Sequence, residues 1–271
     1  MSVDFLKMHG LGNDFVIFDG RTTPVSLSEE QIRMISDRHI GVGCDQLIIM
    51  EPSEKADVFM RIYNADGGQV ASCGNATRCV AWVLMEESGK DNVTLETQAG
   101  LLSCKRIEGN RICADMGEPK FDWQDIPLSE PRDTLNLGIS LGELFDPVAV
   151  SMGNPHAIFI VSDVEKIRVP KMGPVLEKFP VFPERANISF AQPINEHYVK
   201  LKVWERGVGV TLACGTAACA TLVGLHRRGL VGRKATIELP GGELEVQWDE
   251  ATNHVLMTGA VTVAFKGSID V

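Results

Sequence analysis

The first half of this chain returns in its second half at a constant distance of 141 residues. Residues 13–18 match 154–159, residues 58–63 match 199–204, and the Cys-Gly-Asn-Ala run at 73–76 matches Cys-Gly-Thr-Ala at 214–217. After one inserted residue, segment 94–100 aligns with 236–242 at a distance of 142. A gapless series of this length predicts two like domains instead of one large one.

The repeat sets the expected domain limits and fold class. We expect an N-terminal domain at 1–118, completed by residues 262–271, and a C-terminal domain at 119–261, with the Pro-rich segment 119–143 as the connection. Alternating or β-branched runs at 58–63, 93–97, 101–106 and 111–115 predict strands. Each repeat also holds one helix, at 75–88 and 216–228, that is apolar on nearly all sides and ends at a glycine. The prediction is an α+β fold: two pseudo-symmetric domains, each a β-barrel-like sheet around a central buried helix. A peripheral helix is expected at 27–38, with Ser26 and Glu29 at capping-box spacing.

Composition excludes several classes of protein. The 26 basic and 36 acidic side chains give a net charge of −10, which argues against nucleic-acid binding. No apolar run reaches the roughly 20 residues of a membrane span, and the first residues do not resemble a secretory signal. Seven cysteines are an odd number and too sparse for a disulfide scaffold. We therefore expect a cytoplasmic protein that binds neither nucleic acid nor membrane.

Cys73 and Cys214 stand immediately before the two buried helices. The first N–H groups of a helix have no partner inside it, and the helix dipole favours negative charge there, so a thiol at this place is expected to have a lowered pKa. Gly74 and Gly215 leave those amides open to an anion such as a carboxylate. We expect the two helix N-termini to face one another across a cleft between the domains, which would hold the active site.

Two thiols on opposite faces of one carbon suit a racemase or epimerase that uses two bases and no cofactor. One thiolate would remove the α-proton of an amino acid, and the other thiol would return a proton with inverted configuration. The remaining cysteines favour structural roles at 79, 104, 113 and 219, whereas Cys44, in a Gly-rich loop, stays ambiguous. The cysteine spacing fits zinc poorly, so no metal is expected.

Polar residues recur in matched loops beside these cysteines. Asn13 pairs with Asn154, Gln46 with Asn187, and Asn64 with Glu205, each of the last two lying nine residues before its cysteine. One amide alone would be interpreted as a loop cap and Glu205-Arg206 alone as a surface ion pair, but the matched set favours a polar ligand. His156 is a candidate to bias a thiol's charge, although a lone histidine is more often structural.

Several motifs together closely resemble the diaminopimelate epimerase family from residue 5 to about 267. They are His-Gly-Leu-Gly-Asn-Asp-Phe at 9–15, Asp-Gln at 45–46, Cys-Gly-Asn at 73–75, Gly-Asn-Pro-His at 153–156, Trp-Glu-Arg-Gly at 204–207 and Ala-Cys-Gly-Thr at 213–216. The resemblance implies interconversion of LL- and meso-2,6-diaminopimelate without pyridoxal phosphate, in lysine and peptidoglycan precursor synthesis.

The resemblance also implies roles for individual residues. Cys73 and Cys214 are similar to the two acid/base thiols, and His156 and Glu205 to the pair that tunes them. The substrate contacts implied are Asn13, Gln46, Asn64, Gly74, Asn75, Asn154, Asn187, Glu205, Arg206, Gly215 and Thr216. A homodimer is expected, with Phe265 where many relatives carry a tyrosine at the dimer contact.

Two other hypotheses remain. A cofactor-free proline or hydroxyproline racemase would share the architecture, but its monoamino substrate would not need a receptor for a second amino-acid end. A thiol redox or metal-binding module would instead use the paired cysteines as a dithiol or as zinc ligands.

Overall fold

The computed structural model describes residues 2–270 and divides into two compact units. Unit 1 comprises the chain up to Asp115 together with the residues from Thr258 onward, and unit 2 is Met116–Met257. Both boundaries fall a few residues before the predicted positions. The second lies inside strand β18 (Val255–Ala260), which therefore belongs partly to each unit.

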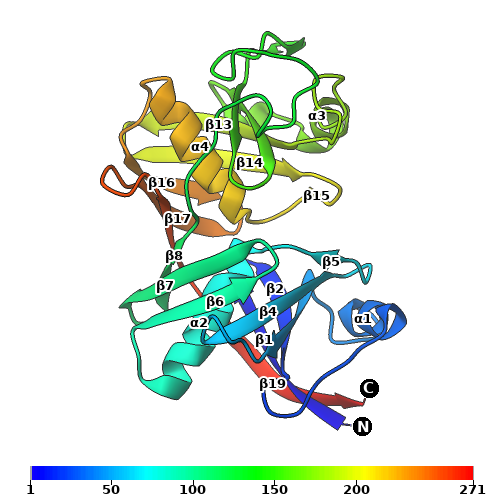
Figure 1. Ribbon diagram of the computed structural model, residues 1–271. Coiled ribbons are helices and arrows are strands. Elements are labelled where there is room, and N and C mark those ends of the chain that lie inside the picture. The colour runs from blue at the N-terminus through cyan, green and yellow to red at the C-terminus, as the bar shows by residue number, and fades with distance from the viewer. Residues whose placement is uncertain (1, 271) are drawn as a thin grey trace. The chain divides into compact units, whose positions relative to one another are not determined.

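Unit 1 is built from strands that surround a single buried helix (Figure 1). Helix α2 (Gly74–Ser88) contacts β1, β2, β6, β7 and β8. The strands and the peripheral helix are β1 (Ser2–Gly10), β2 (Asn13–Asp19), α1 (Glu29–Ser36), β3 (Gln46–Glu51), β4 (Val58–Asn64), β5 (Gln69–Val70), β6 (Asn92–Thr97), β7 (Gly100–Glu108), β8 (Arg111–Asp115) and β19 (Thr262–Asp270). The C-terminal strand β19 pairs antiparallel with β1, so the end of the chain completes the unit that the start of the chain begins.

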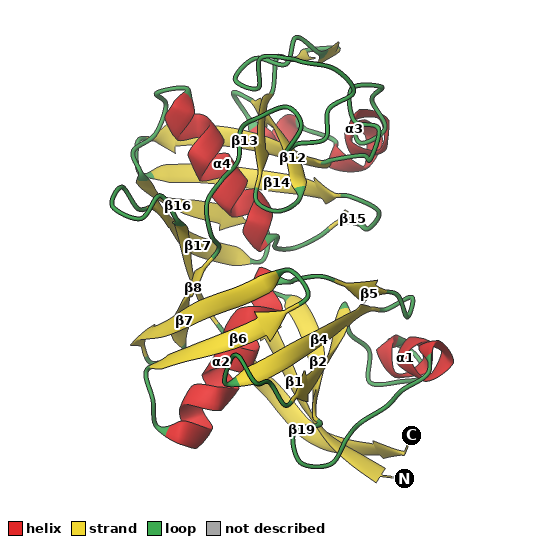
Figure 2. Ribbon diagram, in the orientation of Figure 1, coloured by secondary structure: helices red, strands yellow, loops and turns green. Residues whose placement is uncertain are grey.

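Unit 2 repeats this plan around helix α4 (Gly215–Arg227), as the secondary-structure colouring of Figure 2 shows. Helix α4 contacts β11, β12, β13, β16 and β17. Its other elements are β9 (Ser140–Leu141), β10 (Leu144–Phe145), β11 (Val148–Ser151), β12 (Pro155–Ile160), η1 (Val164–Lys166), α3 (Val169–Leu176), β13 (Asn187–Asn195), β14 (Tyr198–Glu205), β15 (Gly209–Val210), β16 (Lys234–Leu239) and β17 (Gly242–Trp248). The predicted fold, two like units each with strands around a central helix, is confirmed.

Strand pairing follows the repeat residue by residue. Phe15 lies opposite Gln46 in a parallel pair of unit 1, and His156 lies opposite Asn187 in the same kind of pair in unit 2. Likewise, Tyr63 lies opposite Gln69 in unit 1, and the equivalent residues Trp204 and Val210 lie opposite one another in unit 2. Because register decides which side chains share a face of a sheet, this agreement gives equivalent residues equivalent places in their own units.

The ends of the helices confirm one prediction and correct another. Helix α2 ends at Gly89, whose φ of 69° is a left-handed conformation that glycine adopts without a steric cost. The predicted capping box at Ser26 and Glu29 is wrong. Helix α1 begins two residues later, and Ser28 caps it by a reciprocal pair of hydrogen bonds with Gln31.

The Pro-rich segment 119–143, predicted as the connection at the start of the C-terminal domain, belongs to the packed core of unit 2. Ile126, Leu128, Leu137 and Ile139 are buried in the apolar core that also contains Phe159 and Phe190. Proline-rich composition indicated irregular backbone correctly, but apolar side chains spaced along it give the segment enough buried surface to pack. Within residues 2–270, no helix has both the length and the apolar character needed to cross a membrane.

Candidate functional site

Cys73 occupies the N-cap position of α2 and is half-buried. Its Sγ lies 3.9 Å from Asn13 Oδ1, and Asn75 Nδ2 donates to the same oxygen at 3.1 Å. Three predicted site residues, from the start of β2, the N-cap position of α2 and the first helical turn, are therefore brought together. The first-turn amides, beginning at Gly74, point out of the same end of the helix, where the dipole favours an anion.

Two further residues fix the orientation of this group. Arg78, fully buried in the next turn of α2, donates from Nη2 to Asn75 Oδ1 at 2.8 Å. Asp45 accepts a hydrogen bond from Asn13 Nδ2 at 2.9 Å. The sequence reasoning gave Arg78 no role, although a charged residue inside an otherwise apolar helix is a signal that could have identified it.

A cluster of four charged side chains supports the backbone next to Asn13. Asp14 accepts hydrogen bonds from Arg38 Nη1 at 2.9 Å and from the buried Lys7 Nζ at 2.5 Å, and Arg38 also contacts Asp45. Burial alone would raise the pKa of Asp14, but the hydrogen bonds and charges of Arg38 and Lys7 lower it to about 2. Asp14 is therefore a carboxylate near neutral pH. The two negative charges of the cluster are balanced by its two positive charges, so it holds the backbone beside Asn13 without a net charge.

Gln46 and Asn64 lie opposite one another on β3 and β4, and Gln46 Nε2 donates to Asn64 Oδ1 at 3.0 Å. Gln46 Oε1 is buried and has no hydrogen-bond partner within residues 2–270. An unused buried acceptor in a row of predicted contact residues is consistent with a ligand that carries an ammonium or hydroxyl donor.

Cys214 caps the N-terminus of α4 in the equivalent place of unit 2, but it is more deeply buried than Cys73. Its Sγ is 3.7 Å from Thr216 Oγ1. Glu205 lies beside this thiol, and Thr211 Oγ1 donates a hydrogen bond to Glu205 Oε1 at 2.5 Å. The sequence reasoning did not include Thr211.

The prediction of a lowered thiol pKa is wrong for Cys214. Burial raises the pKa of this thiol well above its ordinary value of 9.0, and the charge of Glu205 and a hydrogen bond to its carboxylate raise it further. The Ala217 amide and the Thr216 hydroxyl act in the opposite direction but do not compensate. Desolvation and a neighbouring carboxylate outweigh the helix terminus, so Cys214 rests as the neutral thiol.

His156 is linked to Cys214 by a chain of hydrogen bonds. Its Nε2 lies 2.9 Å from Asn154 Oδ1, Asn154 Nδ2 donates to Thr216 Oγ1 at 3.3 Å, and Thr216 contacts the thiol. Burial, with the charge of Arg206 added, lowers the pKa of His156 to about 3. The imidazole is therefore neutral near pH 7, and any influence it has on the thiol passes through Asn154 and Thr216.

Glu205 and Arg206 stand at the turn between β14 and β15. Asn187, which is buried, donates to Pro155 O at 3.0 Å and accepts the Arg206 backbone N–H at 2.9 Å. The Arg206 side chain is exposed, with Nη1 3.3 Å from Glu184 O. The guanidinium of Arg206 is therefore open to a carboxylate from solvent, the partner that its fork of N–H donors suits.

Glu177, at the C-terminal end of α3, holds both sides of this turn. It is 3% exposed and accepts hydrogen bonds from Trp204 Nε1 at 2.8 Å and from Gly207 N at 2.9 Å. The sequence reasoning missed both α3 and Glu177. The repeat could have identified α3, because the predicted helix at 27–38 corresponds to residues 168–179 at the distance of 141. Two prolines and a glycine in α3 obscured the helical pattern.

Cys44, Cys79 and Cys104 fit structural roles. Burial raises the pKa of Cys79 and of Cys104 to about 12, and burial likewise raises the pKa of Cys44, so these thiols stay neutral. Cys44, which the sequence left ambiguous, donates to Ser36 Oγ at 3.4 Å. Among residues 2–270, no three histidine, cysteine or acidic side chains are grouped as a metal site requires.

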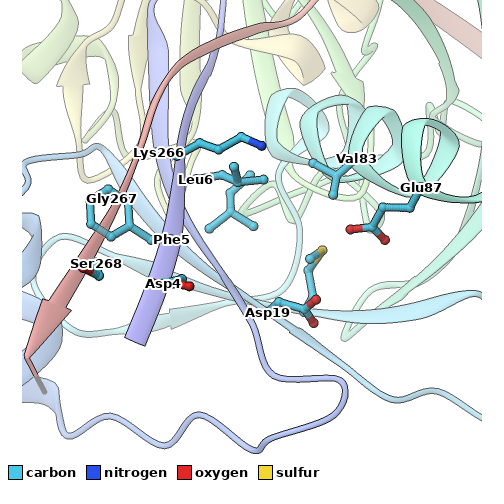
Figure 3. Close-up of a pocket in the computed structure, with 11 residues that line it drawn as sticks. Asp4, Phe5, Leu6, Asp19, Val83, Glu87, Lys266, Gly267 and Ser268 are labelled. Carbon is cyan, nitrogen blue, oxygen red and sulfur yellow. The ribbon is translucent and has the colours of Figure 1, made fainter. Parts of the chain in front are cut away.

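Unit 1 also contains a hollow of about 500 Å³ that includes none of the predicted site residues (Figure 3). It lies between the β1–β19 ribbon and α2, with apolar walls from Phe5, Leu6 and Val83. Lys266 extends across its opening, while Asp19 and Glu87 at its edge are paired with Arg21.

Comparison with known proteins identifies the family. The family model for diaminopimelate epimerase matches residues 5–121 and 148–264. The chain belongs to the diaminopimelate epimerase family. A diaminopimelate epimerase of Acidiphilium cryptum is 51% identical over 266 residues, covering 98% of this chain and 96% of that protein. One from Phenylobacterium zucineum is 50% identical over 273 residues, covering 99% and 98%. The protein is accordingly an isomerase of the racemase and epimerase class.

Solved structures agree on the fold. A PhzF-family phenazine biosynthesis protein of Bacillus anthracis superposes with a TM-score of 0.72 at 18% identity, covering 100% of both chains. A hydroxyproline epimerase of Agrobacterium vitis, solved with trans-4-hydroxy-L-proline bound, gives 0.70 at 17% identity, covering 99% of this chain and 92% of that one. At these identities the likeness concerns the two-unit repeat fold alone.

Proposed function

We propose that this protein interconverts LL- and meso-2,6-diaminopimelate by proton transfer between the α-carbon and two thiols, Cys73 and Cys214. The observation that carries the proposal is the matched pair of cysteine helix caps, each with first-turn amides and an ordered polar network around it. Membership of the diaminopimelate epimerase family supports the choice of substrate.

The step balances with the residues present. A thiolate at one cysteine takes the α-proton, and the electron pair of the broken C–H bond is left on the α-carbon and spreads into the carboxylate. The opposite thiol then gives its proton to the other face, which inverts the configuration and leaves that cysteine as the new thiolate. Because Cys214 rests as the thiol, it is the proton donor in the direction that begins with a Cys73 thiolate.

The first-turn amides supply the electrostatic part of catalysis. The α-carbon of an amino acid is a very weak acid, so charge that moves into its carboxylate must be stabilised by preorganised donors. N–H groups at Gly74, Asn75, Gly215 and Thr216 are suited to this because they belong to helix N-termini. Glu205 stabilises the protonated form of Cys214, and the His156 chain ends on the Thr216 hydroxyl.

The remaining polar residues are proposed to bind the distal amino-acid end, which does not react. An ammonium group could bind the side-chain oxygens of Gln46, Asn64 and Asn13, of which Gln46 Oε1 is an unused acceptor. A carboxylate could accept from the side chains of Arg206 and Asn154, while Asn187 orders the Arg206 backbone. A receptor of this size distinguishes diaminopimelate from a monoamino acid such as proline.

Incubation of LL-diaminopimelate with the protein and inhibitors of pyridoxal enzymes tests the proposal. We expect meso-diaminopimelate to form, and we expect Cys73→Ala and Cys214→Ala each to abolish turnover. Full activity in both variants would contradict the mechanism. Faster turnover of proline than of diaminopimelate would contradict the substrate, and a redox-active dithiol without epimerase activity would favour the thiol redox hypothesis.

Three further features belong to the same proposal. We place the reaction in lysine and peptidoglycan precursor synthesis, because the family resemblance implies it, and in the cytoplasm, because the cysteines are too sparse for a disulfide scaffold. We also propose a homodimer that uses β19, where Phe265 is 50% exposed and packs edge-on against Phe5 at a centroid distance of 6.0 Å. Light scattering of the wild type and of Phe265→Ala tests the dimer: a monomeric wild type would contradict it.

A further inference from the structure

Among the buried polar atoms of the described residues that lack a hydrogen-bond partner, three lie on β12, β13 and α4 of unit 2. His156, Ser189 and Thr221 are all fully buried, and His156 Nδ1, Ser189 Oγ and Thr221 Oγ1 have no hydrogen-bond partner within residues 2–270. A buried polar atom without a partner costs about 1–3 kcal/mol, so three in one unit call for an explanation.

The repeat supplies a comparison inside the same molecule. The residues of unit 1 at a distance of 141 are Phe15, Ile48 and Val80, which are equally buried and entirely apolar. An apolar set therefore fills this place in the same fold, and unit 2 departs from it at all three positions. Each polar side chain is also smaller than its counterpart, most of all serine compared with isoleucine.

Register and helix phase bring the three positions together. His156 lies opposite Asn187, and Ile158 lies opposite Ser189, in the parallel pair of β12 and β13, so the side chains of His156, Ile158 and Ser189 point to one face. Helix α4 lies on that face, because a methyl group on Gly224 would be 3.5 Å from Ile158 Cδ1. Thr221 precedes Gly224 by three residues and shares its side of the helix.

The direction of α4 determines beside which residue of β12 Thr221 lies. Near its start, the helix is hydrogen-bonded to Asn154 through Thr216. Further along, Gly224 lies beside Ile158. Thr221 therefore lies between these two points, level with His156. One imidazole nitrogen and two hydroxyls thus converge on the space between the sheet and the helix.

We propose that His156 Nδ1, Ser189 Oγ and Thr221 Oγ1 bind one buried water molecule, which keeps the proton of His156 on Nε2. The water donates one O–H to Nδ1 and the other to one hydroxyl oxygen, and it accepts the O–H of the second hydroxyl. These three hydrogen bonds are the usual number for a buried water.

The tautomer matters for the chain that leads to Cys214. With the proton on Nε2, His156 donates to Asn154 Oδ1, Asn154 Nδ2 donates to Thr216 Oγ1, and the Thr216 hydroxyl is left to donate to Cys214 Sγ. With the proton on Nδ1, Asn154 would turn its amide over and accept the Thr216 hydroxyl, and the thiolate of Cys214 would lose that donor. This consequence rests on the proposed function, whereas the water site does not.

Nitrogen NMR of ¹⁵N-histidine-labelled protein tests the water site, with the His156 signals assigned by their loss in His156→Asn. In the wild type we expect a protonated Nε2 and an unprotonated, hydrogen-bonded Nδ1 between pH 6 and 8. Ser189→Ala and Thr221→Val should each move the Nδ1 resonance towards that of a nitrogen without a hydrogen bond, and Thr221→Ser should retain the wild-type value. An unchanged Nδ1 resonance in Thr221→Val would overturn the proposal.

Val80→Thr is the matched control, because it makes the reverse exchange at the equivalent place of unit 1 and should leave the His156 signals unchanged. The double variant of Ser189 and Thr221 should lower kcat/KM for diaminopimelate about tenfold, from the loss of one oriented hydrogen bond to the thiolate. A shifted resonance with undiminished kcat/KM would retain the water and overturn its catalytic consequence. A wild type that does not turn over diaminopimelate would contradict the proposed function and leave the NMR test intact.

Discussion

Replacing Glu177 by glutamine tests how α3 positions the turn that carries Glu205 and Arg206. The two carboxylate oxygens accept from Trp204 Nε1 at 2.8 Å and from Gly207 N at 2.9 Å, on either side of that turn. Glutamine preserves the shape of the side chain, but its amide nitrogen donates and cannot accept. One of the two N–H groups therefore loses its partner and faces another donor.

The expected magnitude follows from these contacts. A hydrogen bond to a charged group contributes about 1.5–3 kcal/mol, and a buried donor left unsatisfied costs a similar amount, while removal of a 3% exposed charge returns part of its desolvation cost. We expect a net loss of about 2 kcal/mol in the free energy of unfolding. Because the turn also loses one of its two anchors, kcat/KM should fall by about tenfold.

Urea unfolding followed by circular dichroism measures the first effect, and initial rates with diaminopimelate measure the second. Glu250→Gln is the control, since Glu250 is an exposed carboxylate of the same unit and its replacement should change stability by less than about 0.5 kcal/mol. A Glu177→Gln protein as stable and as active as the wild type would refute the assignment of Glu177 as the anchor of this turn.

Three other substitutions have expected outcomes. Glu205→Gln removes the charge that raises the pKa of Cys214, so alkylation of this thiol by iodoacetamide should begin at lower pH; an unchanged profile would mean that burial alone sets the pKa. Asp14→Asn removes a carboxyl whose pKa is lowered from 3.8 to about 2, so it should reduce stability at pH 7, with the difference from the wild type shrinking as the pH falls from about 4 to 2; a constant difference would argue against the ion cluster. Gly173→Ala puts a methyl group against Trp204 Cγ and should lower the free energy of unfolding by about 1–3 kcal/mol, measured by thermal or urea unfolding. Gly142→Ala is the control, because Gly142 lies in an exposed turn with open space around it and only the cost of a φ of 63° applies. Equal effects of the two substitutions would exclude the clash as the cause.

The repeat predicted most of the fold. Similar residues at a constant distance along the chain implied the same strand register in both units. The equivalent pairs Phe15–Gln46 and His156–Asn187 have that register. Short-range patterns predicted α2 and its terminal glycine because those depend on local backbone chemistry.

Features that depend on tertiary environment were not predicted. The pKa of Cys214 is set by burial and by Glu205, whose carboxylate contacts the thiol only in the folded protein, so the local argument from the helix terminus gave the wrong direction. Glu177 and Thr211 act on Glu205 or its turn through side-chain contacts that no spacing rule encodes. The unsatisfied atoms of His156, Ser189 and Thr221 likewise emerge only when the sheet and α4 are packed together.

The distribution of deuterium at early times in heavy water tests the two-thiol mechanism most directly. The thiol that donates exchanges its proton with solvent before substrate binds, whereas the proton taken from the substrate stays on the other sulfur. We therefore predict that newly formed meso-diaminopimelate carries one deuterium at the inverted α-carbon, while recovered LL-diaminopimelate carries none. Deuterium in the recovered substrate at the same rate, or protium retained in the product, would show that a single base serves both faces and would contradict the assignment of Cys73 and Cys214.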